Sequence, residues 1–140
     1  MPEKIFNYKE CDSGIFGKVK RPLISIEVKD YKGKWIKLKD VLVDSGADIS
    51  ILPRDLGEIL VGDITRGKVV EVRGVVPYAR LIVFIHEIKY KLDEKEFIAP
   101  TAIADSNDVL PILGRVKGMD LFNVLFKNGE KLSLAWNHVR

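Results

Sequence analysis

Apolar and polar residues alternate along much of this chain, in the pattern typical of half-buried β-strands. Apolar side chains occupy every second position of Leu23–Lys29 and recur with the same period in Trp35–Lys39. The residues between these segments, Asp30–Gly33, are common in turns. The pattern predicts a β-hairpin that leads into Val41–Val43, whose continuous apolar side chains are typical of a fully buried strand.

Most of the remaining chain also favours strands. Further strands are predicted at Lys68–Val72, Ala79–Ile88, Lys89–Leu92, Phe97–Ala104, Val124–Phe126 and Lys131–Trp136. Because Pro100 cannot donate a hydrogen bond to a neighbouring strand, its strand is expected at an edge or with a bulge. Asn128-Gly129 is the preferred centre of a type I′ turn, which predicts a hairpin at the carboxyl end.

The length and composition are those of one globular domain. A chain of 140 residues, 46% of them apolar, buries roughly two-thirds of its unfolded surface. Residues 1–20 show no sustained period, and we predict that they form an amino-terminal extension of a folded domain at 21–140. One short helix is expected at Pro53, since Gly57 and Gly62 oppose a long one. The sequence therefore predicts a single all-β domain.

Composition and charge exclude several classes of partner. The longest uninterrupted apolar run is Leu81–Ile85, and the amino terminus lacks the apolar core of a signal peptide. We therefore expect a cytoplasmic protein without membrane contact. The net charge of +3 comes from 23 basic and 20 acidic residues that interleave, with no zinc finger or aromatic platform, so no nucleic-acid partner is expected. The single Cys11 has no Cys or His companion, which argues against a disulfide or a structural zinc.

The strongest candidate for chemistry is the loop that follows the predicted buried strand. Val41–Val43 leads directly into Asp44-Ser45-Gly46, and apolar residues resume at Ile49. Gly46 permits the positive φ or the close backbone approach that a sharp turn needs, which leaves Asp44 at the end of the strand. Asp44 and Asp48 have no third ligand at a useful spacing, so no metal or other cofactor is expected.

The same tripeptide occurs a second time, as Asp12-Ser13-Gly14. Polar residues precede this copy in place of a buried strand, so we interpret it as a surface turn with Asp12 as an Asx-type acceptor. Only 32 positions separate Asp12 from Asp44, too few for an intervening lobe of several strands at roughly 5 to 6 residues each. The two copies therefore cannot form one site within one chain.

A serine hydrolase built on Ser45 is also disfavoured, because the chain has only two His and no Gly-x-Ser-x-Gly turn.

Two motifs together resemble the retropepsin family of aspartic proteases. Asp44-Ser45-Gly46-Ala47-Asp48 is followed about seventy residues later by Ile112-Leu113-Gly114-Arg115, with predicted strands between them. The resemblance spans nearly the whole chain. It implies a closed β-barrel with a single lobe and one or two short helices, and it implies that the folded domain is an aspartic protease.

The resemblance also implies roles for individual residues. Asp44 would be catalytic, within an active-site loop that includes Ser45, Gly46 and Ala47. Ser45 would lock two such loops together across a dimer axis. A flap over bound peptide would lie at Val70–Tyr78, around Gly74. The implied substrate contacts are Gly46, Asp48, Gly74 and Val75, and the implied structural ion pair joins Asp48 to Arg115.

A pair of Asp44 carboxylates accounts for the chemistry. In aspartic proteases, two carboxylates about 3 Å apart share one proton, because ionising both costs roughly 5 kcal/mol, or about four pKa units, at an effective dielectric constant near 20. Such a pair holds a base and an acid side by side. Since each chain supplies one Asp44, we predict a homodimeric aspartic endopeptidase that acts on peptide or protein substrates. The alternative is a catalytically silent dimer of the same fold that binds a peptide or a partner protein.

Overall fold

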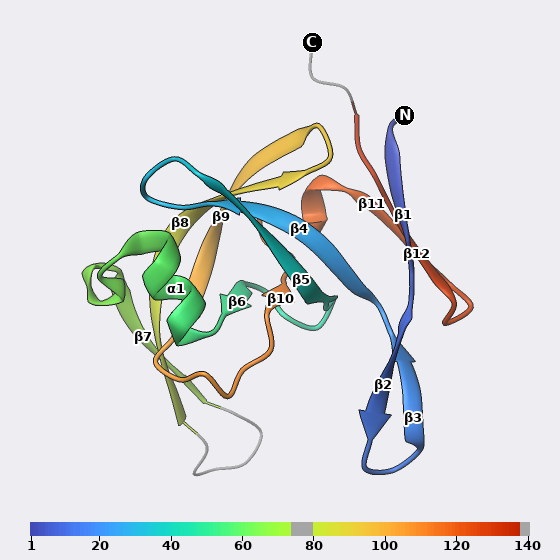
Figure 1. Cartoon of the computed structure of the whole chain (residues 1–140), viewed down its shortest axis with the longest axis horizontal. Helices are drawn as coiled ribbons and strands as arrows, with labels where there is room; N and C mark the ends of the chain where they lie inside the picture. The colour runs from blue at the N-terminus through green and yellow to red at the C-terminus, as the bar shows by residue number, and fades with distance from the viewer. Residues whose placement is uncertain (74–79, 138–140) are drawn as a thin grey trace.

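Most of the chain folds into strands, as shown in Figure 1. The structure is a computed structural model that describes residues 1–73 and 80–137. Its strands are β1 (Glu3–Asn7), β2 (Lys9–Ser13), β3 (Gly17–Arg21), β4 (Leu23–Lys29), β5 (Trp35–Val43), β6 (Ser50–Leu52), β7 (Lys68–Arg73), β8 (Arg80–Leu92), β9 (Lys95–Ala104), β10 (Ile112–Leu113), β11 (Asn123–Lys127) and β12 (Lys131–Ala135). Its helices are α1 (Arg54–Val61) and the 3₁₀ turns η1 (Ile64–Arg66) and η2 (Met119–Leu121).

Six strands close into a barrel. Their order is β4-β5-β10-β6-β9-β8, and β8 pairs back onto β4 through Val28 and Tyr90. Strand β7 continues the sheet beyond β8. The predicted all-β class with a closed barrel and short helices is therefore confirmed.

A second sheet joins the two ends of the chain. Strand β12 lies between β1 and β11, with Glu3 opposite Ala135 and Phe6 opposite Leu132. Strands β1 and β12, near the two ends of the chain, therefore lie side by side in Figure 1. Residues 1–20 also contain the β2–β3 hairpin, so this segment holds three strands that its irregular pattern did not predict. The boundary of the folded domain at residue 21 stays a prediction.

The predicted turns follow the local sequence signals. Asn128 and Gly129 have φ values of 54° and 67°, as a type I′ turn requires, and they join β11 to β12. Pro100 lies inside β9, where it is opposite Glu87 of β8. On the other side of β9, the pairing with β6 covers only Thr101 to Ile103. The strand of Pro100 is therefore an interior strand with a continuous register, not the edge or bulged strand expected from the sequence. Pro100 lies just outside the β6 ladder, where a neighbouring strand needs no donor from it.

Aromatic side chains tie the barrel to the second sheet. Tyr90 stacks on Phe97 within the barrel, with ring centroids 5.3 Å apart. Phe97 meets the edge of Phe122, and Phe122 meets the edge of Trp136, which follows β12. All four side chains are buried. Edge-to-face contacts of this kind add to the stability gained from burial alone, so the barrel and the second sheet share one core.

The short helix α1 packs closely on the barrel. It begins at Arg54, one residue later than the start at Pro53 that the sequence predicted, and Pro53 is its N-cap. It ends at Gly62, which has a positive φ of 78°. Gly57 lies inside the helix and directly against Ile103 of β9, where an added Cβ would collide with the Ile103 side chain. The glycine that argued against a long helix is therefore the residue that lets this helix approach the sheet.

Candidate active site

The loop at 44–49 connects two strands that are not neighbours. β5 and β6 follow each other along the chain, but β10 lies between them, parallel to β5 and antiparallel to β6. Because paired strands lie about 4.8 Å apart, the loop spans roughly twice that distance across the end of β10. Asp44 stands at the start of this crossing and directly follows the buried Val43.

Backbone hydrogen bonds hold the loop on the segment that follows β10. The N–H of Asp44 donates to the carbonyl of Leu113 at 3.2 Å. In the opposite direction, the N–H groups of Arg115 and Val116 donate to the carbonyls of Ala47 (2.9 Å) and Asp48 (2.8 Å). The two motifs noted in the sequence are therefore in direct contact, and the second motif supports the first through its backbone.

Gly114 makes this contact possible. An added Cβ would collide with the backbone carbonyl of Ile49 and would lie 2.8 Å from the backbone nitrogen of Ser50. The hydroxyl of Ser50, which is fully buried, accepts a hydrogen bond from the Gly114 N–H at 3.0 Å. Only a residue without a side chain fits between the loop and the strand end. Ser50 was not predicted as a site residue, since a serine between two isoleucines carries no specific signal.

The Asp44 side chain is half-buried and turns back onto its own loop. Its Oδ1 atom accepts a hydrogen bond from the Gly46 N–H at 2.9 Å. Gly46 has no positive φ, so of its two predicted uses the structure shows the close approach: an added Cβ would lie 3.2 Å from that same oxygen. The bond fixes one carboxylate oxygen.

The rest of the loop is directed outward. Ser45, Gly46 and Asp48 are exposed in the single chain, and Ala47 is half-buried. Exposed polar groups on a loop with a fixed backbone are free to contact a second molecule. Gly74 and Val75, which the resemblance assigns to substrate binding, lie outside the described residues.

The structure differs from the expected ion pair of Asp48 with Arg115. The guanidinium of Arg115 instead contacts the carboxylate of Asp120, with Nε and Nη2 each 3.4 Å from an oxygen. The backbone explains this choice, because the Asp120 N–H donates to the Arg115 carbonyl at 3.0 Å and the resulting turn brings the two side chains together. Asp48 is joined to this segment by its carbonyl only.

Apolar side chains surround the loop on the side of β7 and β8. Val83, Ala102 and Ala104 form a small buried cluster of their own, separate from the main core. Partly buried side chains from the loop region and from the β7–β8 hairpin pack against it: Ile49, Ile51, Val70, Leu81 and Val109. An apolar surface thus links the Asp44 loop to the strands that lead to the predicted flap.

A buried polar contact lies behind this region of the sheet. The hydroxyl of Tyr90 is 2.7 Å from the Thr101 hydroxyl, which donates to the Ala99 carbonyl at 3.2 Å. Burial raises the pKa of Tyr90 above its ordinary value, and hydrogen bonds with Thr101 and Ser50 oppose that change only in part. The tyrosine is therefore a neutral, fixed part of the scaffold.

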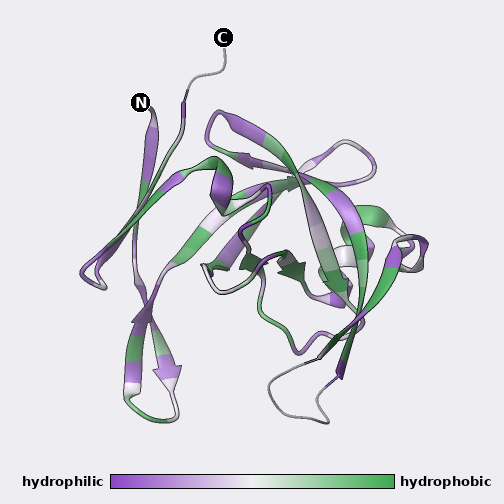
Figure 2. Cartoon of the chain, turned by 180° about the vertical axis from the view of Figure 1, so that it is seen from behind, coloured by the Kyte–Doolittle hydropathy of each residue, from purple (hydrophilic) through white to green (hydrophobic). Residues whose placement is uncertain are grey.

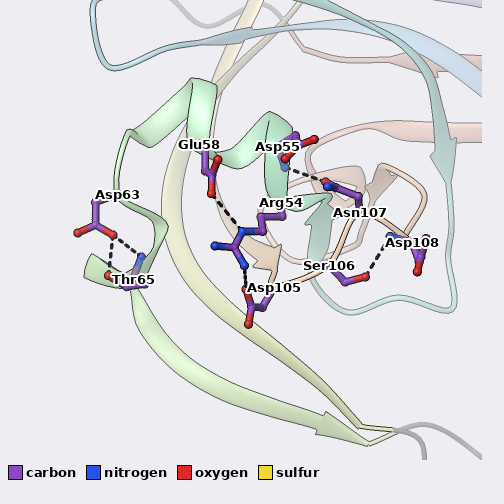
Figure 3. A network of polar contacts seen from close by, with 9 residues as sticks. All are labelled: Arg54, Asp55, Glu58, Asp63, Thr65, Asp105, Ser106, Asn107 and Asp108. Carbon is purple, nitrogen blue, oxygen red and sulfur yellow. Dashed lines mark hydrogen bonds and ion pairs between the residues drawn. The ribbon is translucent and has the colours of Figure 1, made fainter.

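A network of polar side chains connects α1 to the loop before β10, as Figure 3 shows. Arg54 donates to Glu58 at 3.1 Å and to Asp105 at 2.5 Å. The hydrogen bond with Glu58, followed by the charge of Asp105, raises the pKa of Arg54. Asn107 accepts a hydrogen bond from the Asp55 N–H at 2.9 Å, at the helix start. The network fixes the chain that leads from β9 to Leu110 and β10.

The second Asp-Ser-Gly copy lies on the exposed β2–β3 hairpin. Asp12 pairs with Lys18 across the hairpin. The hydroxyl of Ser13 accepts hydrogen bonds from the backbone N–H groups of Ile15 (3.3 Å) and Phe16 (3.2 Å). This copy is a surface turn as predicted, but its acceptor is Ser13 and not Asp12.

In residues 1–73 and 80–137, no three His, Cys, Asp or Glu side chains gather in a way that would hold a metal ion. Over the same residues, no helix has the length and apolar character that crossing a membrane demands.

A closed barrel with an Asp-Ser-Gly loop held on a Leu-Gly-Arg segment defines the retropepsin-like class of fold. Comparison with solved structures agrees: the chain is similar to the crystal structure of a retropepsin-like aspartic protease from Rickettsia conorii, with a TM-score of 0.62 and 16% identity over 97% of this chain and 95% of that one. It is also similar to EIAV protease complexed with the inhibitor HBY-793, with a TM-score of 0.43 and 22% identity over 69% of this chain and 83% of that one. No protein-family model matches the sequence, and no curated protein matches it at a significant level. The chain has the retropepsin-like fold, which confirms the resemblance noted from its motifs.

Proposed function

We propose that this chain is an aspartic endopeptidase that works as a homodimer, with one Asp44 from each copy. The observation that carries the proposal is the geometry of the Asp44 loop. A half-buried carboxylate follows a buried strand, and backbone hydrogen bonds on both sides of the loop fix its position. The outward direction of Ser45, Gly46 and Asp48 leaves this loop free to meet its counterpart in a second chain.

The reaction follows from two carboxylates that share one proton. The ionised Asp44 removes a proton from a water molecule held between the two acids, and the water oxygen forms a bond to the carbonyl carbon of the peptide. The protonated Asp44 of the other chain donates its proton to the carbonyl oxygen, which gives a tetrahedral diol. As the C–N bond breaks, the first Asp44 passes the proton it took from water to the leaving nitrogen, and one hydroxyl of the diol gives its proton to the second Asp44. The products are a carboxylic acid and an amine, and the pair again shares one proton.

The surroundings of the loop favour apolar peptide side chains. Ile49, Ile51 and Val109 lie next to the loop and pack on the same small cluster as Val70 and Leu81 of the β7–β8 hairpin. A peptide bound between the loop and this hairpin would place alternate side chains against that surface. We therefore expect cleavage next to hydrophobic residues, in a peptide held extended.

The test compares the two Asp-Ser-Gly copies. Purified wild-type protein, Asp44→Asn and Asp12→Asn are incubated with a library of short peptides at acidic and neutral pH, and the products are identified by mass spectrometry. Asp12 is followed by the same Ser-Gly but lies on an exposed hairpin, where it pairs with Lys18. It is therefore the matched control.

We expect cleavage by the wild type and by Asp12→Asn, and none by Asp44→Asn, because an amide can neither accept the proton of water nor share one. Cleavage that persists in Asp44→Asn would reject the proposed chemistry. Binding of peptides without products in any variant would instead favour a catalytically silent peptide-binding dimer.

A further inference from the structure

The β2–β3 hairpin extends away from the barrel and ends in exposed apolar side chains. In the described part of the chain its two strands pair only with each other. Ile15 and Phe16 at its tip are 86% and 74% exposed. Figure 2 shows this tip as a hydrophobic segment, at the end of a hairpin that projects from the molecule. An isolated two-stranded hairpin is marginally stable in water. Two large apolar residues exposed at its tip would be stabilised by contact with a binding partner.

A pocket connects the base of this hairpin to the strand that carries Asp44. It has a volume of about 180 Å³. Its apolar lining comes from Cys11 of the hairpin, from Leu23 and Leu42 of the barrel, and from Leu110 of the loop before β10. Leu42 precedes the catalytic aspartate by two residues. The pocket therefore lies against the strand that leads into the candidate active site, and it continues onto the hairpin.

The position of the hairpin base is fixed by an ion pair. Lys9 of β2 contacts Asp40 of β5, and both residues line the pocket. Asp40 has a positive φ of 59°, a conformation uncommon outside glycine, so the strand bends where its side chain meets Lys9. The hairpin is thus tied to the catalytic strand at its base and unsupported at its tip.

The charges along the hairpin argue against a membrane as the partner. The hairpin carries four basic side chains, Lys9, Lys18, Lys20 and Arg21. Three of them contact a carboxylate, Lys9 that of Asp40, Lys18 that of Asp12 and Lys20 that of Glu130. Anionic lipid surfaces attract clusters of basic residues, and here most of the positive charge is neutralised within the protein. Free strand edges and a half-apolar face instead suit an extended peptide, which adds to an edge through its backbone.

We propose that the β2–β3 hairpin is a substrate-binding arm for peptide segments beyond the catalytic loop. This inference rests on the proposed function. An extended substrate places one side chain in the pocket at Leu42 and Leu110 and continues along the hairpin to Ile15 and Phe16. A strand of five residues is about 16 Å long at roughly 3.3 Å per residue, so the arm serves about five residues of substrate. The enzyme therefore selects long segments that carry an apolar residue remote from the cleaved bond.

The experiment compares a short and a long substrate with the same cleavage core. The long versions add about six residues at one end or the other, enough to reach the tip at 3.3 Å per residue, and they end in a Leu. Wild-type protein is compared with the double variant Ile15→Ser, Phe16→Ser. Ile59→Ser is the control, because Ile59 lies on α1 and is 54% exposed. Since exposed side chains are changed, the variants are expected to fold.

We expect the ratio of kcat/KM for the long peptide to that for the short one to fall about tenfold in the tip variant through KM, given the apolar area removed. The ratio should be unchanged in Ile59→Ser. Binding of the long peptide to Asp44→Asn protein, measured by fluorescence anisotropy, should weaken by the same factor when the tip is changed.

An unchanged ratio in the tip variant would overturn the proposal of a substrate-binding arm, while the proposed protease function would stand. If the tip variant instead loses kcat/KM equally for both peptides and sediments as a monomer, the tip contacts a second copy of the chain and not the substrate. Failure of the wild type to cleave either peptide would reject the proposed function itself.

Discussion

Gly114 determines whether the Asp44 loop can rest on the barrel. Its Cα lies so close to the loop that an added Cβ would meet the backbone of Ile49 and Ser50. Backbone atoms cannot move aside as the end of a flexible side chain can. A larger residue at position 114 would therefore disrupt the backbone hydrogen bonds that fix Asp44.

We expect Gly114→Ala to lower the free energy of unfolding by about 2 kcal/mol or more, as overpacking at buried sites does. Urea denaturation followed by tryptophan fluorescence measures the change. Gly14→Ala is the matched control, because an added Cβ there meets nothing within 4 Å, and its effect should stay within about 0.5 kcal/mol. Equal stability of the two variants would show that the loop has room to shift.

The ionisation of Tyr90 should make the free energy of unfolding depend on pH in the alkaline range. Burial raises its pKa in the folded protein, whereas in the unfolded chain a tyrosine ionises near pH 10. Above pH 10 the unfolded state therefore binds fewer protons than the folded state, and the free energy of unfolding falls as pH rises. Below pH 10 the tyrosine is neutral in both states and contributes no slope.

The comparison with Tyr90→Phe isolates this residue. At neutral pH the variant loses the contact with Thr101, at a cost of about 1 kcal/mol. Above pH 10 the wild type should lose up to about 1.4 kcal/mol per pH unit more than the variant. Thermal melts at a series of pH values from neutral to alkaline measure both effects. Parallel pH profiles for the two proteins would contradict the assignment of a raised pKa.

The helix α1 takes its amino-terminal cap from another part of the chain. Pro53 at the cap position has no side chain that accepts a hydrogen bond. Asn107 supplies the acceptor instead, for the Asp55 N–H. The helix start and the loop that leads to β10 are thus stabilised by the same contact.

We expect Asn107→Ala to destabilise the protein by about 1 kcal/mol, the usual cost of a lost cap. Hydrogen exchange should quicken in the first turn of α1 and in the 105–110 loop. Asn107→Asp should retain wild-type stability, since its carboxylate still accepts and its charge suits a helix amino terminus. A loss of the same size in both variants would point to the amide nitrogen and not to the cap.

Elements with local signals were predictable, and those that depend on distant partners were not. The β4–β5 hairpin and the turn at Asn128-Gly129 follow from alternation and turn chemistry alone. Strand β1 has no such pattern, because it is held by β12, which lies more than a hundred residues away. A short, half-exposed strand of this kind gains its stability from pairing and not from its own sequence.

In the candidate site, too, the features with a local sequence signal were predictable and the others were not. The motif located Asp44 and the segment that supports it, because both have recognisable local sequences. The partner of Arg115 was not predictable in this way. A backbone hydrogen bond from the Asp120 N–H to the Arg115 carbonyl closes the turn that brings the two side chains together, and the spacing of charges in the sequence does not show that turn. Ser50 was missed because its role is to satisfy one backbone N–H, which any buried hydroxyl in the right place can do.

The whole molecule has one Asp44 per chain, so the proposed chemistry depends on how chains associate. A dimer of one wild-type and one Asp44→Asn subunit contains one carboxylate and one amide. It lacks the shared proton, and it should be inactive. The catalytic unit is therefore expected to be sensitive to inactive partners in a way that an enzyme with a complete site in each chain is not.

We expect a threefold excess of Asp44→Asn protein to reduce the activity per wild-type subunit to about one quarter, because random pairing leaves only that share of wild-type chains with a wild-type partner. The subunits are mixed, allowed to exchange, and assayed at a fixed wild-type concentration. The same excess of Asp12→Asn protein, which keeps Asp44, should raise the total activity instead. If added Asp44→Asn protein left the rate unchanged while sedimentation showed mixed dimers, one Asp44 would suffice, and the reaction would need a second acid from within the same chain.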